Sequence, residues 1–433
     1  LALGAALALC AGASATTVEN NFYEALTATN GSIKLENDFV YEKAMEVNYD
    51  LTIDLNGYVL TIPKSICVNS GGHLTIKDSG SNATHKFTPN SDGLWVLDEN
   101  GSETIPGGVI TGGTGYPIQF GSGAHVYDAY YGGAVYIKPG GTLNMEGGSI
   151  VGCSAVYGGG VYVAGTFSMT GGSIIGCAAD RGGGVYMRDD DAFFNMSGSA
   201  AIRYCKAASK DSSYASGGGV YALGAFTMSG NAAIRDCECI TDSRHAAGGG
   251  VYLAYNNKPT TFIMCGSAVI DHCKVTSPQN GMSYGGGVYV SDQASLTLKD
   301  QAAIRKCSAE NTAGGVTHGG GIFVDSGSLT IEGSAKIGEN CTANIGSGIY
   351  MEVPRNSHAS QNLYANGGVI EGEVVLNNVS NHGGTITITI TGSDEGVTEF
   401  KGSVLNNGGT IEKGKFTGEV TNNGTISGGE FSG

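Results

Sequence analysis

The chain of 433 residues contains 73 glycines but only 8 prolines and has no Gly-X-Y period, which excludes collagen. Hydrophobic residues make up 41% of the sequence, enough to bury a core, so the composition is not that of a disordered protein. Charged residues make up only 14% and the formal net charge is -16, which disfavours nucleic acid and anionic lipid surfaces as partners.

Residues 1–15, LALGAALALCAGASA, are apolar and end in an A-x-A pattern, which is typical of a secretory signal peptide. Because the stretch lacks an initial methionine and a basic leader, we expect the printed sequence to begin inside its gene product. No other apolar run is long enough to cross a bilayer. The sequence therefore predicts an extracellular or cell-surface protein without a membrane span in this chain.

Residues 16–100 precede the main repeat and are expected to form an N-terminal cap with the first strands of the fold. ENNFYEAL, at 19–26, predicts a short helix, whereas LTIDLNGYVLTI (51–62) and HLTIKDSG (73–80) alternate as strands do. A polar cap over the first coil is what the end of a solenoid requires.

Residues 101–352 contain a glycine-rich motif that recurs at intervals of 24 to 37 residues. A constant motif with variable spacing indicates one structural unit with insertions of variable length. Its copies are GGAVY (132–136), GGGVY (158–162, 182–186, 217–221, 248–252, 285–289), GGGIF (319–323) and GSGIY (346–350).

Each unit holds three short apolar runs. In one unit Val161 and Val163 share a face, Phe167 and Met169 follow, and Ile174 completes the third run. Three alternating strands joined by glycine-rich corners describe one coil of a parallel β-helix. The predicted fold class is therefore all-β, a single-stranded parallel β-helix of about eight main coils.

Residues 353–433 change to a shorter period. Phe400, Phe416 and Phe431 recur 16 and 15 residues apart, beside NNGGTI (406–411) and NNGTI (422–426). This pattern predicts a slimmer β-solenoid that continues the rod, and we expect the printed sequence to stop within it.

The GG[AG]VY motif followed by GTFSMTGGSI resembles the β-helix repeats of secreted bacterial adhesin-like surface proteins, and more distantly the polymorphic outer-membrane proteins of chlamydiae. The LTIDLNGYVLTI and GGHLTIKDSG stretches resemble the start of such surface proteins. The resemblance implies a right-handed helix and a bacterial cell-surface location. One departure is that the polymorphic family pairs its glycine motif with FxxN, whereas this chain has F-x-M.

One aromatic residue occupies the same place in eight successive coils, and we expect these side chains to face outward as a ladder. Tyrosine combines an apolar ring with a polar tip, so such a ladder can bind sugars or a protein partner. Alternatively, the rings stack on each other and stiffen the sheet. The predicted ladder consists of Tyr136, Tyr162, Tyr186, Tyr221, Tyr252, Tyr289, Phe323 and Tyr350.

Seven cysteines fall at one corner of the coil: Cys153, Cys177, Cys205, Cys237, Cys273, Cys307 and Cys341. Cysteine is a good small buried hydrophobe, so a reduced, buried ladder is one interpretation. Disulfides, with Cys239 or Cys265 as further partners, are a second, because export permits them. A zinc site from Cys237, Cys239, His272 and Cys273 is a third.

Clustered carboxylates at Asp189, Asp190 and Asp191 suggest Ca²⁺ binding or acid–base chemistry on a polysaccharide, against the simpler interpretation of a solvated loop. His318 precedes a glycine corner and is interpreted as loop surface or as a lone acid or base. Insertions at 208–216, 240–247, 276–284 and 310–318 leave one edge of the rod, either as recognition loops or as neutral growth.

The first functional hypothesis is a monomeric, adhesin-like binding protein without catalysis or cofactor, whose elongated surface takes glycans or extracellular proteins. The alternatives are a carbohydrate-active β-helix enzyme, either a lyase or a glycoside hydrolase, and a purely structural stalk. A net charge of -16 argues against an enzyme with a polyanionic substrate. A cleft with convergent ionisable groups from adjacent coils would favour the enzyme.

Overall fold

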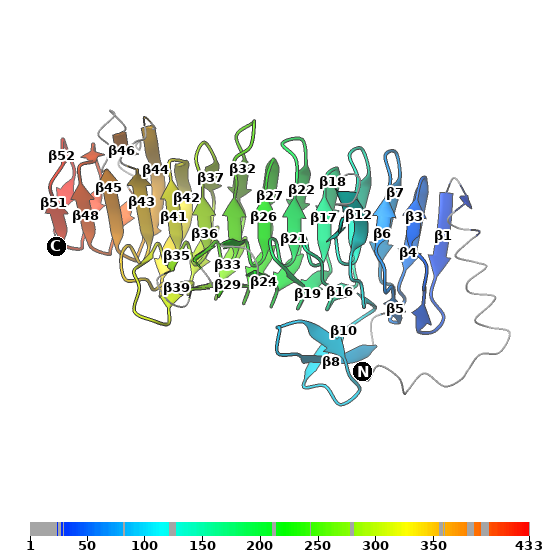
Figure 1. Cartoon of the computed structure of the whole chain (residues 1–433). Coiled ribbons are helices and arrows are strands. Elements are labelled where there is room, and N and C mark those ends of the chain that lie inside the picture. The colour runs from blue at the N-terminus through cyan, green and yellow to red at the C-terminus, as the bar shows by residue number, and fades with distance from the viewer. Residues whose placement is uncertain are drawn as a thin grey trace.

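The computed structural model describes residues 24, 27–28, 30–80, 83–120, 127–209, 214–242, 244–277, 281–354, 358, 360–378, 385–390 and 398–432. Within them the chain is all-β and winds into a long rod of parallel strands, from β1 (Asn30–Lys34) at one end to β53 (Glu430–Phe431) at the other (Figure 1). The prediction of an all-β fold built as a parallel β-solenoid is confirmed. The proposed signal peptide at 1–15 lies outside the described residues.

Each coil places three strands around a dry interior. In one coil these are β17 (Val161–Val163), β18 (Thr166–Met169) and β19 (Ser173–Ile175). They pair in register with β21 (Val185–Met187), β22 (Phe193–Met196) and β23 (Ala201–Arg203) of the next coil. Like side chains therefore stack along the axis, as the repeated motif predicts.

Phenylalanines form the clearest stack of the interior. Phe167, Phe194, Phe226 and Phe262 are at most 1% exposed, and successive ring centroids lie 4.3 to 4.9 Å apart. Burying such a side chain contributes roughly 1.5–3 kcal/mol. The interior ladder is thus a main source of the rod's stability.

In the coil that begins at Gly158, each glycine of the triplet meets a different constraint. Gly158 has φ +68°, in the left-handed region that favours glycine. A Cβ on Gly159 would lie 2.3 Å from the carbonyl oxygen of Gly183 in the next coil. A Cβ on Gly160 would lie 2.7 Å from a methyl group of Ile174 inside the coil. The corner is therefore closed by backbone packed against backbone.

The stack begins before the glycine motif. Strands β1, β4 (Asp50–Asp54) and β7 (His73–Lys77) pair in parallel, and β7 continues into β15 (Thr142–Met145) of the main repeat. The short helix expected at 19–26 falls almost entirely outside the described residues.

The C-terminal coils are shorter, as the sequence pattern predicts. Strands β45 (Val374–Asn378), β48 (Val404–Asn407) and β51 (Val420–Asn422) stack in parallel. Phe400, Phe416 and Phe431 stack with centroids 4.8 and 5.0 Å apart. The rod continues through this region (Figure 1).

The insertions at 208–216, 240–247, 276–284 and 310–318 do not emerge as separate loops, which corrects their interpretation. Their described residues, with the residues before them, form two thin parallel sheets that we call the fin. One sheet comprises β20 (Ala178–Ala179), β24 (Lys206–Ser209), β29 (Glu238–Thr241), β34 (Lys274–Ser277) and β39 (Ser308–Asn311). The other comprises β25 (Tyr214–Ser216), β30 (His245–Ala247), β35 (Met282–Tyr284) and β40 (Thr317–His318).

Small side chains explain why the fin can close. Ala207, Ala215, Cys239 and Ala246 are at most 1% exposed and form part of a separate cluster between its two layers. Register stacking along the axis meanwhile satisfies the backbone hydrogen bonds of both layers.

A small antiparallel sheet was not expected from the sequence. It comprises β8 (Thr84–Pro89), β9 (Trp95–Leu97) and β10 (Glu103–Pro106), and it lies beside the rod (Figure 1). Trp95 is 5% exposed and packs with Val151 and Ile175 on the outside of the coils. We call this sheet the side sheet.

Candidate functional site

The eight predicted aromatic residues lie together on the outward face of one sheet, at the second position of consecutive strands. Neighbouring rings from Tyr162 to Tyr350 have centroids 4.7 to 5.3 Å apart and planes 3 to 15° apart. The strands are β14 (Val135–Ile137), β17, β21, β26 (Val220–Ala222), β31 (Val251–Leu253), β36 (Val288–Val290), β41 (Ile322–Asp325) and β43 (Ile349–Val353).

This geometry changes what the ladder offers a ligand. Because each ring stacks on the next, the ring faces between Tyr162 and Tyr350 contact other rings, and the edges and hydroxyl groups remain for outside contacts. Sugars therefore cannot stack on the ring faces that lie between neighbouring rings of the ladder. Mutual stacking of the rings, the alternative interpretation, is observed.

Other elements cover much of the ladder. A hairpin of β12 (Tyr116–Phe120) and β13 (Tyr127–Tyr131) covers its beginning, where Tyr116 stacks on Tyr136 at 5.4 Å and Tyr131 meets Tyr162 edge-on at 4.9 Å. Five ladder side chains are 3 to 9% exposed, and three are partly exposed. The buried ones are Tyr136, Tyr162, Tyr221, Phe323 and Tyr350, and the partly exposed ones are Tyr186, Tyr252 and Tyr289.

A second row of side chains runs beside the ladder, one residue before each glycine motif. This flanking row pairs from coil to coil in register, and its members are large at both ends but small in the middle. It consists of Tyr131, Tyr157, Arg181, Ser216, Ala247, Tyr284, His318 and Ile345. Next to Ala247 the ladder residue Tyr252 is partly exposed, whereas Tyr221 next to Ser216 is buried.

A pocket of about 150 Å³ opens at this place, and we call it the notch. Ladder residues Tyr252 and Tyr289 lie on one side, and Tyr284 of β35 and His245 of β30 lie on the fin side. The full lining is Tyr214, Ala215, Ser216, His245, Ala247, Tyr252, Tyr284 and Tyr289. The structure thus joins two predicted ladder residues to fin residues that the sequence did not single out.

The notch is polar but carries no charged side chain in its lining. Burial raises the pKa of the Tyr252 hydroxyl, so this group stays protonated. Burial and the neighbouring Arg244 lower the pKa of His245, which favours the neutral imidazole. The Tyr289 hydroxyl donates to an Asp325 carboxylate oxygen at 2.9 Å.

Two carboxylates lie beyond the notch at the far side of the ladder. Asp325 and Glu352 pair in register on neighbouring coils, and burial raises the pKa of both. The like charge of Asp325 raises the pKa of Glu352 further, and the like charge of Asp292 raises the pKa of Asp325 further. They are the nearest approach to a pair of acid–base groups on this face.

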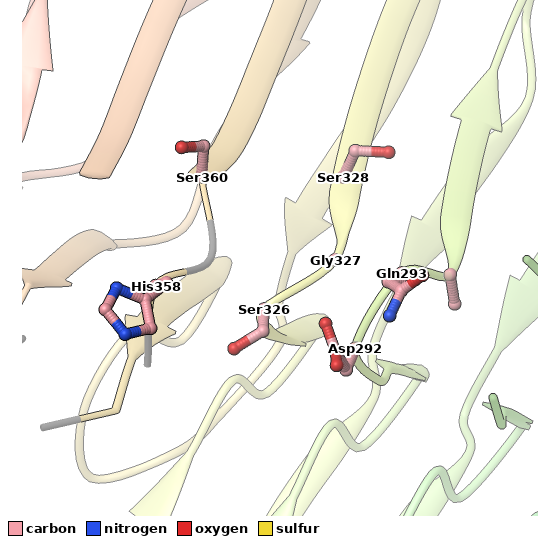
Figure 2. A pocket seen from close by; sticks show the side chains of 8 residues that line it. Asp292, Gln293, Ser326, Gly327, Ser328, His358 and Ser360 are labelled. Atoms are coloured by element: carbon pink, nitrogen blue, oxygen red, sulfur yellow. The ribbon is translucent and has the colours of Figure 1, made fainter. Parts of the chain in front are cut away.

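A larger, open pocket of about 480 Å³ lies over the turns that lead from the aromatic sheet into the next strands. Figure 2 shows side chains from three successive turns around it, with Asp292 and His358 well apart. Its lining is Asp292, Gln293, Ala294, Ser326, Gly327, Ser328, His358 and Ser360. Serines and one amide dominate this groove, so it suits hydrogen bonding more than acid–base chemistry.

The cysteine ladder lies inside the coils. All ten cysteines in the described part of the chain are free thiols. Burial raises the pKa of Cys205, Cys237 and Cys307, and each thiol donates to the carbonyl oxygen two residues earlier at 3.2 to 3.5 Å. Their role here is packing.

The predicted metal sites find little support in geometry. Among the described residues no group of three or more His, Cys, Asp or Glu side chains is placed to hold a metal ion. Near the proposed Ca²⁺ site, Asp189 pairs with Arg188 at 3.6 Å and Asp191 with Lys258 at 2.6 Å. Asp189 and Asp191 thus pair with cations of the chain itself, whereas one buried carboxylate oxygen of Asp190 has no hydrogen-bond partner among the described residues.

His318 is not a loop residue, which corrects its interpretation. It belongs to β40 and its ring lies 5.7 Å from Tyr284 and 4.5 Å from Tyr350. Burial lowers its pKa. The residue is therefore part of the aromatic layer.

The fold and surface together define a class: an all-β parallel solenoid with an aromatic layer and a fin along one side. No known family, curated protein or solved structure matches the chain. In the part that the structure describes, no helix is both long and apolar enough to span a membrane.

Proposed function

We propose that the protein is a secreted or cell-surface, adhesin-like solenoid that binds glycans or extracellular proteins without catalysis. The observation that carries this proposal is the aromatic layer, which stacks from Tyr162 to Tyr350 and opens at the notch. A stack of paired rings on a hydrogen-bonded sheet is pre-organised, so a ligand orders few side chains when it binds. Bacterial origin and export rest on the resemblance of the repeats and of residues 1–15.

The enzyme alternative has weaker support. Asp325 is engaged by Tyr289, and the open groove in Figure 2 offers one carboxylate and one imidazole on well-separated turns. Polysaccharide cleavage generally uses two carboxylates that flank one bond.

An array of glycans and extracellular matrix proteins tests the proposal. The purified chain should bind a subset of the array, and a Tyr252→Phe/Tyr289→Phe variant should bind that subset more weakly because it loses two hydroxyl groups but keeps the ring stack. Robust turnover on a polysaccharide panel, with or without Ca²⁺, would contradict the non-catalytic function. An array without any hit would contradict binding.

A further inference from the structure

We propose that the notch is a binding site for one neutral pyranose ring at the end of a glycan. This inference rests on the proposed function and narrows it to one place and one class of ligand. Its support comes from size, from one open ring face and from the polar groups around it.

The size of the notch suits a single six-membered ring. A volume of about 150 Å³ equals that of an engineered protein cavity that accepts benzene. The pocket opens to solvent on the outer side of the sheet, so the rest of a glycan can extend away from it.

Tyr284 supplies the stacking surface that the ladder lacks. Its ring stacks on His318 at 5.7 Å and 17°, and it is turned 62° from the ladder ring of Tyr289. The neighbour on the other side in the flanking row is Ala247, which has no ring. One face of Tyr284 is therefore turned toward the space above Ala247, where the apolar face of a pyranose can pack on it.

Hydroxyl groups and an imidazole surround this face. Ser216, Tyr252 and Tyr289 are lining residues with hydroxyl groups, and the His245 ring, tilted 34° with its centroid 6.1 Å from that of Tyr284, lies at the edge of this face. The Nδ1 atom of His245 is buried and has no hydrogen-bond partner among the described residues. Because this atom is buried, a ligand in the notch meets the ring surface of His245 and not its Nδ1 atom.

The absence of charge from the notch lining points to an uncharged sugar. A uronate carboxylate would lose its hydration beside neutral groups, and Asp325, which accepts from Tyr289, would repel it. A neutral hexose or N-acetylhexosamine meets only hydroxyl, imidazole and ring surfaces.

Ala247→Tyr is the variant that tests the site, because tyrosine already occupies the same row at Tyr157 and Tyr284. The new ring should fill the notch without disturbing the backbone. Ile345→Tyr is the matched control, since it places the same ring in the same row outside the notch lining. Thermal unfolding checks that both variants fold.

Saturation-transfer NMR and titration with methyl glycosides of neutral hexoses and N-acetylhexosamines provide the readout, with methyl uronates and N-acetyltyrosinamide as comparison probes. At least one neutral glycoside should bind with a Kd on the order of 1 mM. Ala247→Tyr should weaken this binding at least tenfold, and Ile345→Tyr should change it less than twofold.

Three outcomes would overturn the inference: no neutral glycoside binds, Ala247→Tyr binds as well as wild type, or the uronates or N-acetyltyrosinamide bind more tightly. If wild type still gives array hits in any of these cases, the proposed function survives and only its site or ligand class is wrong. If the array also gives none, both fail.

Discussion

The residue before each ladder cysteine shows how single side chains set the outer surface. Among the described coils this position has φ between 51 and 63°. Asparagine, with a side chain that tolerates this conformation, occupies it at Asn340, whereas glycine occupies it at Gly152 and Gly176. A Cβ on Gly176 would lie 2.1 Å from Trp95 of the side sheet. The absence of a side chain at Gly176 therefore leaves the space that the Trp95 ring occupies.

Gly176→Asn should therefore displace the side sheet while leaving the coil backbone unstrained. Overpacking of this kind costs roughly 1–3 kcal/mol. Trp95 is the only tryptophan of the chain, so its fluorescence should shift to longer wavelength as the ring becomes exposed. Lys306→Asn, at the equivalent position away from the side sheet, should leave the emission unchanged. Identical spectra for the two variants would contradict this account of Gly176.

Glu352 carries a prediction about pH. Because burial raises its pKa, the folded state binds its proton more tightly than the unfolded chain, so the stability linked to this proton is lost as pH rises through the folded pKa. Glu352→Gln should raise Tm at pH 7, and the gain should shrink as pH falls below the ordinary range of glutamate. Differential scanning calorimetry at several pH values measures it. If the Tm difference between Glu352→Gln and wild type instead increased as the pH fell, the prediction would be contradicted.

At the scale of elements, the fin and the side sheet show where the sequence stops being informative. The strands of the coil were predictable because Val161, Phe167 and Ile174 alternate and repeat. The fin strands are short and rich in alanine and serine, residues with little strand preference, so the sequence pattern indicates loops there. The only trace of the side sheet in the sequence is indirect: glycine precedes the ladder cysteine at positions 152 and 176, where the side sheet packs against the coil.

Ala246→Leu tests the packing of the fin. Ala246 is fully buried between the two layers, so a larger side chain should separate them, at a cost of roughly 1–3 kcal/mol. Cys239, buried in the same cluster, should then react with a thiol reagent many times faster, as peptide mapping by mass spectrometry would show. Cys237, inside the coil, is the internal control. Equal acceleration at both cysteines would mean that the whole coil, and not the fin alone, had opened.

For the whole molecule, the all-β parallel solenoid and its short C-terminal period followed from repeat spacing. All eight ladder positions followed as well, because a V-Y pattern fixes which side chain faces out. The notch did not follow, since the flanking row changes from Tyr157 to Ala247 to His318 and has no periodic signal. The proposed binding site lies where the residue type in the flanking row changes from one coil to the next.

Removal of one interior ring should destabilise the rod locally. Phe226→Ala deletes a 1% exposed ring between Phe194 and Phe262, and such core changes cost about 3–5 kcal/mol. Because solenoid coils contact mainly their neighbours, hydrogen-exchange protection should fall most in β22, β27 (Ala225–Met228) and β32 (Thr261–Met264). A uniform loss along the rod would contradict this nearest-neighbour behaviour.

The most direct test of the binding account is one glycan array probed in parallel with wild type and with Ala247→Tyr. The account predicts that wild type binds glycans ending in a neutral pyranose and that Ala247→Tyr, equally folded, loses those signals. Retention of the same signals by Ala247→Tyr would contradict it.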